Sequence, residues 1–409
     1  MINERWALRP LGELFEISAG KTMSATARNG EGKIPFLRTS NVLWDEIDLS
    51  TVDRMVIPAH ELESKLLRPG DLLVCEGGEI GRAAVWNGEV EVMSFQNHLH
   101  RLRPLAHDVE PRFYVYFLQS GFTQLGIFEG AGNRTTIPNL SRNRLATLGV
   151  PHPDLDEQRA IVQALAHIRK GISVHKKAHR LARALKRAAM HDLFTRGLRG
   201  GPQKNTEIGL VPVNWELISA SEIFRLASGK TRPSPIGPHP SPDRPFPVLG
   251  GNGVMGYSSE WNVDAPRILT IGRVGEYCGV VHIASGKAWI TDNALYAKEW
   301  LLPEVSLRFV GAFLAYFDLN RFRRMAGQPL VTQGMINEHS IPIPNPKEQE
   351  EIADILDALD RKIDLHDRKC AVFEELFKAL LHNLMTGDVG VTDLDLPALA
   401  PSGSEPAAV

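Results

Sequence analysis

Apolar residues between positions 348 and 385 recur with the spacing of a helix that packs against a second helix. They alternate steps of four and three residues, so they line one stripe of an α-helix, and such a regular stripe predicts a partner helix. The stripe consists of Ile352, Leu356, Leu359, Ile363, His366, Cys370, Phe373, Phe377, Leu380 and Leu384.

A second stripe of the same kind begins in the middle of the chain. Its first members are Ile161, Leu165, Ile168, Ile172 and His175. The apolar positions that follow have a shifted phase, which we interpret as a stutter in the heptad pattern; they are Val174, Ala178, Leu181 and Leu185. The two stripes predict long helices over about 157–194 and 348–385.

The rest of the chain contains short β-branched runs between glycine and proline clusters, which predict strands. Residues 6–22, WALRPLGELFEISAGKT, align without a gap with residues 215–231, WELISASEIFRLASGKT, and share Trp, Leu, Glu, Phe, Gly, Lys and Thr at the same positions. Further pairs follow in the same order and end in VPHPDLDEQRAIV and IPNPKEQEEIADIL, where proline before Glu-Gln marks a helix start. Such an internal repeat indicates that a β-rich domain followed by a helix occurs twice.

We therefore predict an α+β fold with two pseudo-symmetric β-rich domains, each followed by a long helix, and with the two helices paired in an antiparallel coiled coil. The predicted segments are a first domain at 1–150, a central spacer helix at 151–204, a second domain at 205–343, a C-terminal spacer helix at 344–388 and a disordered tail at 389–409.

The composition indicates the cellular compartment and reveals one strongly basic segment. Three cysteines without C-x-x-C spacing favour neither a disulfide framework nor a zinc site, and no apolar run is long enough to span a membrane. We therefore expect a protein of the reducing cytoplasm. The formal net charge is −2, but residues 169–204 hold eleven Lys or Arg and one acid, Asp192. This run is either a solvated helix face or a surface for nucleic acid.

The repeated Gly-Lys-Thr, at 20–22 and 229–231, raises the alternative of a nucleotide-binding loop. A phosphate loop also needs a glycine five positions before its Gly-Lys, and the chain has Phe15 and Phe224 there. We therefore reject a nucleotide site and interpret the motif as part of the repeat.

The repeated segments also carry a resemblance to a known family. The paired P-x-P…EQ helix starts, the helix ends DLFTRG and NLMTGD, and the segments FLRTSNV, GGEIGR and GRVGEYCG resemble specificity subunits of type I restriction-modification systems over residues 1 to about 388. The resemblance implies that each β-rich domain is a target-recognition domain for one half of a split double-stranded DNA sequence. It also implies that the helices form a spacer that docks two methyltransferase subunits, in a complex with restriction and translocase subunits.

One feature departs from that family pattern. Residues 346–388 hold eleven acids and six bases, whereas the central helix is basic. The two helices are therefore not electrostatically alike, and equivalent partner contacts on both do not follow from the repeat alone.

The chain itself is predicted to be non-catalytic and free of metal. It has no N/D-P-P-Y/F tetrapeptide of the amino-methyltransferases and no acid-acid-Lys nuclease cluster, and His98 and His100 lack a third ligand. The resemblance places S-adenosylmethionine, ATP and Mg²⁺ on partner subunits that supply the adenine methyltransferase and the endonuclease. An alternative from another class is a coiled-coil scaffold with two β-rich domains that bind protein or glycan; the basic first helix and the duplicated polar loops favour DNA.

Candidate DNA contacts are side chains in loops that can bond base edges or phosphates. In the first domain they are Lys21, Thr22, Arg38, Asn41, Arg82, Asn97, Asn133 and Arg134, and in the second Lys230, Thr231, Asn252, Arg273, Asn293, Gln328, Thr332 and Gln333. On the spacer helix, phosphate or partner contacts are expected from Lys176, Lys177 and Arg180. Residues shared by both halves are better explained as structural, which makes Arg134 and Gln333 the preferred base readers.

Two similar halves that read one duplex most simply adopt a pseudo-two-fold arrangement, and their helices then run antiparallel. Full overlap of the predicted helices makes paired residue numbers add to about 541. This register predicts His175 beside His366, Ile168 beside Phe373 and Ile161 near Leu380.

Overall fold

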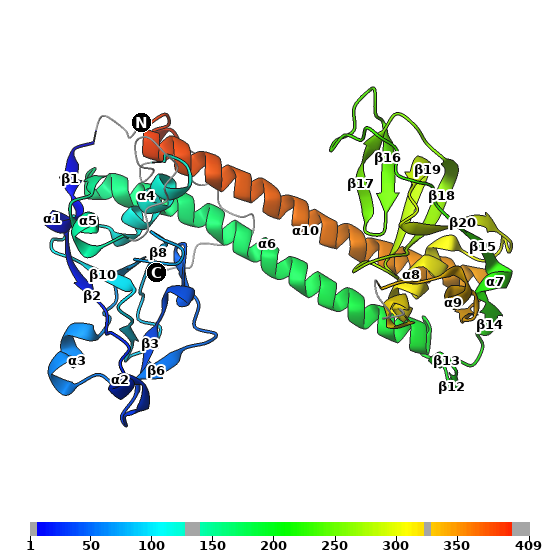
Figure 1. The fold of residues 1–409 in the computed structure, drawn as a ribbon, viewed down its shortest axis with the longest axis horizontal. Coiled ribbons are helices and arrows are strands. Elements are labelled where there is room, and N and C mark those ends of the chain that lie inside the picture. The colour runs from blue at the N-terminus through cyan, green and yellow to red at the C-terminus, as the bar shows by residue number, and fades with distance from the viewer. Residues whose placement is uncertain (1–5, 127–139, 323–328, 395–409) are drawn as a thin grey trace. The chain divides into compact units, whose positions relative to one another are not determined.

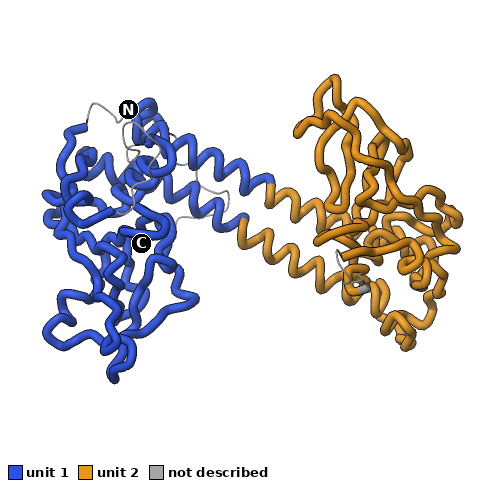
Figure 2. The backbone as a smooth tube through the Cα atoms, in the orientation of Figure 1, with its two compact units in different colours: residues 1–175, 368–409 blue, residues 176–367 orange. Residues whose placement is uncertain are grey.

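The computed structural model describes residues 6–126, 140–322 and 329–394 (Figure 1). It contains two compact units (Figure 2): unit 1 comprises residues 1–175 and 368–409, and unit 2 comprises residues 176–367. Two long helices, α6 (Leu155–Arg196) and α10 (Pro346–Thr386), each contribute one part to unit 1 and the other part to unit 2. Each unit therefore combines a β-rich part with a pair of helical segments, and the predicted α+β class is confirmed.

Unit 1 is built on two small sheets. The four-stranded sheet has the order β2 (Phe15–Ala19), β10 (Leu99–Pro104), β7 (Leu72–Cys75) and β8 (Ala83–Val85), and the three-stranded sheet has the order β6 (Asp53–Met55), β3 (Ile34–Leu37) and β9 (Ser94–Phe95). Two shorter pairs are β1 (Leu8–Pro10) with β11 (Gly149–Pro151) and β4 (Val42–Leu43) with β5 (Glu46–Ile47). The short helices are α1 (Leu11–Leu14), α2 (Ala25–Asn29), α3 (Ala59–Lys65), α4 (Pro111–Thr123), α5 (Arg142–Ala146), η1 (Thr39–Asn41) and η3 (Val391–Asp393).

Unit 2 has one larger sheet. Its order is β15 (Phe224–Ser228), β20 (Ala294–Trp300), β18 (Val263–Gly272), β19 (Val281–Ile290), β16 (Phe246–Gly250) and β17 (Gly253–Ser258). Two further pairs are β12 (Gln203–Thr206) with β13 (Gly209–Pro212) and β14 (Glu216–Ser219) with β21 (Ser340–Ile343). The short helices are α7 (Ala220–Ile223), α8 (Leu307–Phe317), α9 (Gln333–Asn337) and η2 (Leu319–Phe322).

The two units repeat one topology, as the sequence repeat predicts. The strand order β2-β10-β7-β8 recurs as β15-β20-β18-β19, and the parallel pair of β3 and β9 recurs as β16 and β19. Along the chain, α1, α4 and α5 recur as α7, α8 and α9. Helices α2 and α3 are additions of unit 1, since the segments between β15 and β16 and between β17 and β18 are fully described and not helical.

The Glu-Gln motif at each long-helix start has a structural explanation. In unit 1 the buried Gln158 amide donates to the Pro153 and Asp108 carbonyls, at 2.8 and 3.0 Å, and its oxygen accepts from the Glu110 N–H at 2.8 Å. Glu110 is the N-cap of α4, so one glutamine joins the start of α6 to the start of α4. We call this contact set the glutamine clamp.

Unit 2 repeats the clamp. Gln349 donates to the Pro344 carbonyl at 2.8 Å and accepts from the N–H of Ser306, the N-cap of α8, at 2.7 Å. Both glutamines are fully buried, so their polar groups need these partners. The repeated glutamine of the Glu-Gln motif is thus required by the packing of each unit.

The long helices show the predicted seam, with one correction. All ten predicted seam positions of α10 are buried or half-buried. In α6 the same 4–3 spacing continues without a change of phase through His179, Ala182, Lys186, Ala189 and Leu193, all buried or half-buried. The predicted stutter is therefore wrong: the sequence conceals the seam because small and polar residues occupy it.

No helix in the described ranges is both long and apolar enough to cross a membrane.

Three of the four apolar residues assigned to the shifted phase lie on the outside of α6, and the fourth, Ala178, is half-buried. Val174, Leu181 and Leu185 are exposed to 47%, 61% and 55%. No helix among the described residues covers them, although their spacing is that of a contact stripe.

Within each unit the helical segments run antiparallel, as predicted, but in a different register. In unit 2, Lys186 Nζ lies 2.7 Å from Asp360 Oδ2 and His179 Nε2 lies 3.3 Å from Asp367 Oδ1, so paired residue numbers add to 546 and not to 541.

Unit 1 has the same register. The Arg169 guanidinium lies 5.6 Å from the ring centre of Phe377, and Phe373 stacks on His175 at 5.5 Å. A Cβ at Gly171 would come within 3.0 Å of the Phe373 ring. The Phe373 ring packs against Gly171 and not beside Ile168 as the predicted register required. The register was predicted from full overlap of the two helices, whereas the packing of this ring favours the observed one.

The start of the predicted disordered tail is ordered. Residues 391–393 form η3, Val391 is buried in the core of unit 1, and Leu394 packs against the same core. The prediction of disorder is therefore wrong for 389–394, where two apolar side chains complete a core that α4, α6 and α10 leave open. Residues 395–409 lie outside the described ranges.

Candidate nucleic-acid interface

The repeated Gly-Lys-Thr forms a backbone crossing in each unit. The Lys21 N–H donates to the Phe95 carbonyl at 2.9 Å, and the Asn97 N–H donates to the Lys21 carbonyl at 3.1 Å. In unit 2, the Lys230 N–H donates to the Ile290 carbonyl at 3.0 Å, and the Asp292 N–H donates to the Lys230 carbonyl at 2.8 Å. The motif thus joins the end of β2 to the segment before β10 in unit 1, and the end of β15 to the segment before β20 in unit 2.

Glycine is required at this crossing because two backbones touch there. A Cβ at Gly20 would lie 2.3 Å from the carbonyl oxygens of Phe95 and Gln96, and one at Gly229 would lie 2.2 Å from the Thr291 oxygen. No side chain fits at such distances. The motif is structural, which agrees with the rejection of a nucleotide-binding loop.

The two lysines of the motif have different surroundings. The Lys21 side chain is only 17% exposed and pairs with Glu61 of α3 at 2.7 Å, and this hydrogen bond lowers the pKa of the Glu61 carboxyl. Lys230 is exposed and has no ion pair within the described ranges. Of the two motif lysines, Lys230 is therefore the one that offers an uncompensated positive charge to a polyanion.

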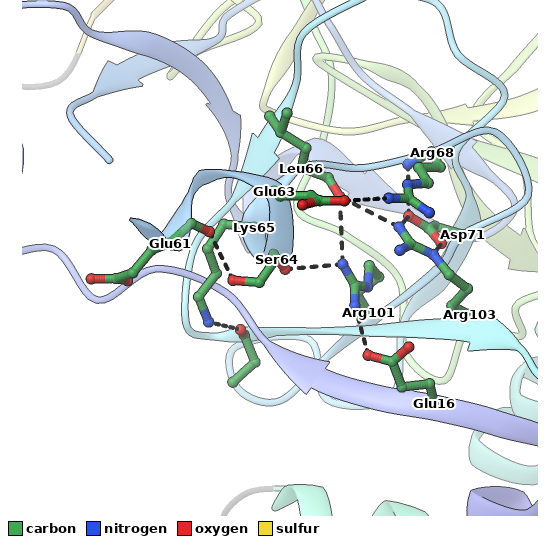
Figure 3. A network of polar contacts seen from close by, with 11 residues as sticks. Glu16, Glu61, Glu63, Ser64, Lys65, Leu66, Arg68, Asp71, Arg101 and Arg103 are labelled. Carbon is green, nitrogen blue, oxygen red and sulfur yellow. Dashed lines mark hydrogen bonds and ion pairs between the residues drawn. The ribbon is translucent and has the colours of Figure 1, made fainter. Parts of the chain in front are cut away.

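Helix α3, which supplies Glu61, is fixed by a polar network (Figure 3). Lys65 donates to the Ala19 carbonyl at 2.6 Å, and Arg101 donates to the Ser64 carbonyl at 3.0 Å. These contacts tie the helix to β2 and β10. Insertion of α3 is therefore what neutralises the motif lysine of unit 1.

Unit 1 also has a surface cleft of 380 Å³ beside the crossing, which we call the cationic cleft. Four basic side chains and one acidic one line it, together with one amide and two apolar residues: Arg28, Lys33, Arg38, Arg54, Asp53, Gln96, Met23 and Phe36. Arg38 pairs with Asp53 at 2.6 Å, which leaves three cations in excess. Such a cleft attracts a phosphate backbone.

The sequence predicted only Arg38 among these lining residues. Arg28, Lys33, Arg54 and Gln96 were missed. The first two lie in the glycine-containing segment ARNGEGK, whose basic residues were the available signal. The repeat did not reveal Arg28 and Lys33, because the corresponding segment of unit 2, between β15 and β16, has a different sequence.

The other predicted residues of unit 1 differ in accessibility. Thr22 is exposed, and the half-buried Asn97 side chain makes no hydrogen bond to described residues. Arg82 donates to the Thr39 carbonyl at 2.9 Å. Asn41 is a correction: its buried amide bonds the carbonyls of Asp48 and Thr51 and the Arg38 N–H, so it organises a turn and has no group left for a base. Asn133 and Arg134 lie outside the described residues.

Three predicted residues of unit 2 are brought together. The Arg273 N–H donates to the Asn293 carbonyl at 2.9 Å, and the Arg273 carbonyl accepts from Val331, next to Thr332. The Thr332 hydroxyl caps α9, so its role is structural at least in part. Other predicted residues are placed as follows: Thr231, Asn252 and Asn293 are exposed, Gln333 is half-buried at the start of α9, and Gln328 lies outside the described residues.

The predicted basic residues of the spacer helix are exposed on α6, namely Lys176, Lys177 and Arg180. The exposed side chains of Lys177 and Arg180 are available for phosphate or for a partner protein.

Comparisons with known proteins identify the family. The family model for the type I restriction modification DNA specificity domain matches residues 3–181 and 212–375. The chain is 25% identical to the putative type I restriction enzyme MjaX specificity subunit of Methanocaldococcus jannaschii, over 95% of both chains. It is 31% identical to the EcoprrI specificity subunit of Escherichia coli, over 28% of each chain.

Solved structures share the fold. The type I restriction-modification S subunit from M. genitalium superposes with a TM-score of 0.63 at 19% identity, covering 94% of this chain and 96% of that one. A chain from a study of complex assembly in the type I R-M system gives a TM-score of 0.56 at 15% identity, over 95% and 100% of the two chains. With the family match extending over both repeats, this chain belongs to the type I restriction-modification DNA specificity family.

Proposed function

We propose that this chain is the non-catalytic specificity subunit of a type I restriction-modification complex and reads a bipartite DNA target, one half-site with each unit. The observation that carries the proposal is the duplication: the DNA specificity domain matches both halves, and both units repeat one topology and one backbone crossing. The side chains around the crossing differ between the units, so two copies of one scaffold read two different sequences.

Charge supports the DNA contact in both units. The cationic cleft of unit 1 and the exposed Lys230 of unit 2 lie next to the equivalent crossing. Lysine and arginine contacts to phosphate supply affinity without sequence information, while amides and guanidinium groups read base edges. Each crossing thus holds its loops beside the DNA backbone, and neighbouring side chains select the sequence.

The partner surfaces lie on the long helices. Leu181 and Leu185 of α6 are exposed in unit 2, and Val372 and Leu376 of α10 are exposed to 67% and 38% in unit 1. The second pair follows the first by 191 residues, the same offset that relates the seams. Two equivalent apolar pairs fit two copies of one partner, the methyltransferase subunit. S-adenosylmethionine, ATP and Mg²⁺ belong to the methyltransferase and restriction subunits, and the complex acts on DNA in the cytoplasm.

Changing Leu181 and Leu185 together to glutamate is expected to remove one methyltransferase copy from the complex. Each leucine loses apolar contact area, so binding at this face weakens by at least about tenfold. Native mass spectrometry of the co-expressed complex measures the stoichiometry. The matching change of Val372 and Leu376 removes the other copy, and Leu105→Glu, at an exposed leucine outside the helices, leaves two. Two copies bound to the fourfold variant would exclude these docking faces.

The function is tested by co-expressing the chain with the methyltransferase encoded beside it and mapping methylated bases by long-read sequencing. A split motif with an unspecified gap is expected. A continuous motif would contradict reading by two units. Absence of methylation by an intact complex would overturn the proposed function as a whole.

A further inference from the structure

The backbone of Gln96 is held in place by hydrogen bonds to its neighbours. Its N–H donates to the Leu37 carbonyl and its carbonyl accepts from the Leu99 N–H, both at 2.9 Å, and it pairs with Lys21 across the crossing. The backbone is therefore fixed from three sides. The side-chain amide is half-buried in the wall of the cationic cleft and makes no hydrogen bond to the described residues.

The charges of the cleft surround this amide. Arg28 and Lys33 are exposed and have no acidic partner in the described part of the chain, and Arg54 donates to the Lys33 carbonyl at 3.0 Å. A polyanion is the ligand class that satisfies these cations, because phosphates accept several charged hydrogen bonds at once. A nucleic-acid strand bound in the cleft would bring its bases within reach of the Gln96 wall.

The equivalent residue in unit 2, Thr291, has no exposed side chain that could contact a base. Thr291 forms the corresponding bridge with Lys230, but its side chain is fully buried and its hydroxyl oxygen has no partner among the described residues. The same backbone position therefore carries an accessible amide in unit 1 and a buried hydroxyl in unit 2. The two units must differ at some shared positions if they are to select different half-sites.

We infer that Gln96 is a specificity-determining residue of unit 1, whose amide reads an adenine while Arg28 and Lys33 hold neighbouring phosphates. Glutamine pairs with adenine through two hydrogen bonds, to N6 and N7 in the major groove. The inference rests on the proposed function and assigns one base position within it. It predicts that unit 2 makes no base contact from the corresponding position.

The test is the methylation pattern of Gln96→Ala and Gln96→Glu in the complete methyltransferase complex. Alanine is expected to lower discrimination for adenine at one position of one half-site by roughly 5- to 150-fold, the range of a good bidentate base contact. Glutamate can accept from the cytosine amino group, so it moves the preference at that position toward cytosine. The other half-site stays unchanged in both variants.

Two further variants separate base reading from other roles. Arg28→Ala and Lys33→Ala weaken binding to all sequences alike and each lowers the slope of log K against log salt by about one, with an unchanged motif. Gln163→Ala, at an exposed glutamine of α6, leaves both motif and affinity unchanged.

The outcomes distinguish this inference from the proposed function. A wild-type motif in Gln96→Ala overturns the inference while the split motif of the wild type still stands. Relaxation of both half-sites, or of several positions together, shows that Gln96 acts through the fold and also overturns it. Loss of methylation together with a melting temperature below that of the wild type likewise shows a structural role and overturns the inference.

Discussion

Replacing Gly20 by alanine is expected to destabilise unit 1 by about 4 kcal/mol or more, among the largest effects of a single substitution. The new methyl group would lie 2.3 Å from two backbone carbonyl oxygens, and neither can rotate away as a side-chain end could. One of these oxygens belongs to Phe95, whose side chain is fully buried. The crossing must therefore open, and the hydrogen bonds on either side of Lys21 break with it.

Urea denaturation followed by hydrogen exchange of peptides from each unit measures this effect and locates it. Gly229→Ala is expected to act in the same way on unit 2. Gly77→Ala is the matched control, because no atom lies within 4 Å of the new methyl group and the backbone φ is not positive. A loss below about 1 kcal/mol in Gly20→Ala would mean that the crossing yields at little cost.

Replacing Gln158 by leucine is expected to lower the free energy of unfolding of unit 1 by about 3–5 kcal/mol. The Glu110 N–H and the carbonyl oxygens of Asp108 and Pro153 lose their partners. A buried group without a partner costs about 1–3 kcal/mol, and the part-buried groups of Glu110 and Asp108 lie at the low end of that range. The side chain keeps its approximate size, so little of the loss comes from altered packing. Unit 2 should lose less from Gln349→Leu, since this glutamine has two partners in place of three.

Denaturation monitored by hydrogen exchange again gives the measurement. Protection should fall first at the starts of α4 and α6, which the clamp joins. Gln163→Leu, further along α6 and exposed, is the control. Equal losses in the two variants would show that helix propensity and not the clamp determines stability.

The sequence predicts those features that depend on periodic apolar residues or on the repeat itself. The α10 seam is legible because Ile, Leu and Phe fill most of it, and the antiparallel pairing follows from the symmetry of the halves. The α6 seam is hidden because its later positions are His179, Ala182, Lys186 and Ala189, while larger apolar residues lie on the exposed face. Apolar spacing identifies a contact stripe but not which of two stripes is covered within the chain.

The candidate site was predictable only in part. The repeat marks the crossing, but equal residues in the two halves do not have equal partners, since Glu61 neutralises Lys21 and comes from a helix that unit 2 lacks. Asn41 is a residue type that can read bases, but both N–H groups of its amide donate to the backbone carbonyls of Asp48 and Thr51. The cleft depends on β3, β6 and α2 approaching one another, and no local sequence pattern records that approach.

The helix register has a consequence for the way in which a duplicated chain stays one chain. Because the seams recur at an offset of 191, the counterparts of Asp360 and Asp367 in the first half are Arg169 and Lys176. Two first halves associating through α6 in the observed register would set Lys186 against Arg169 and His179 against Lys176. The Lys186–Arg169 pair is like-charged and repels, whereas Asp360 of α10 attracts Lys186. The charges thus favour pairing of α6 with α10 over pairing of α6 with a copy of itself.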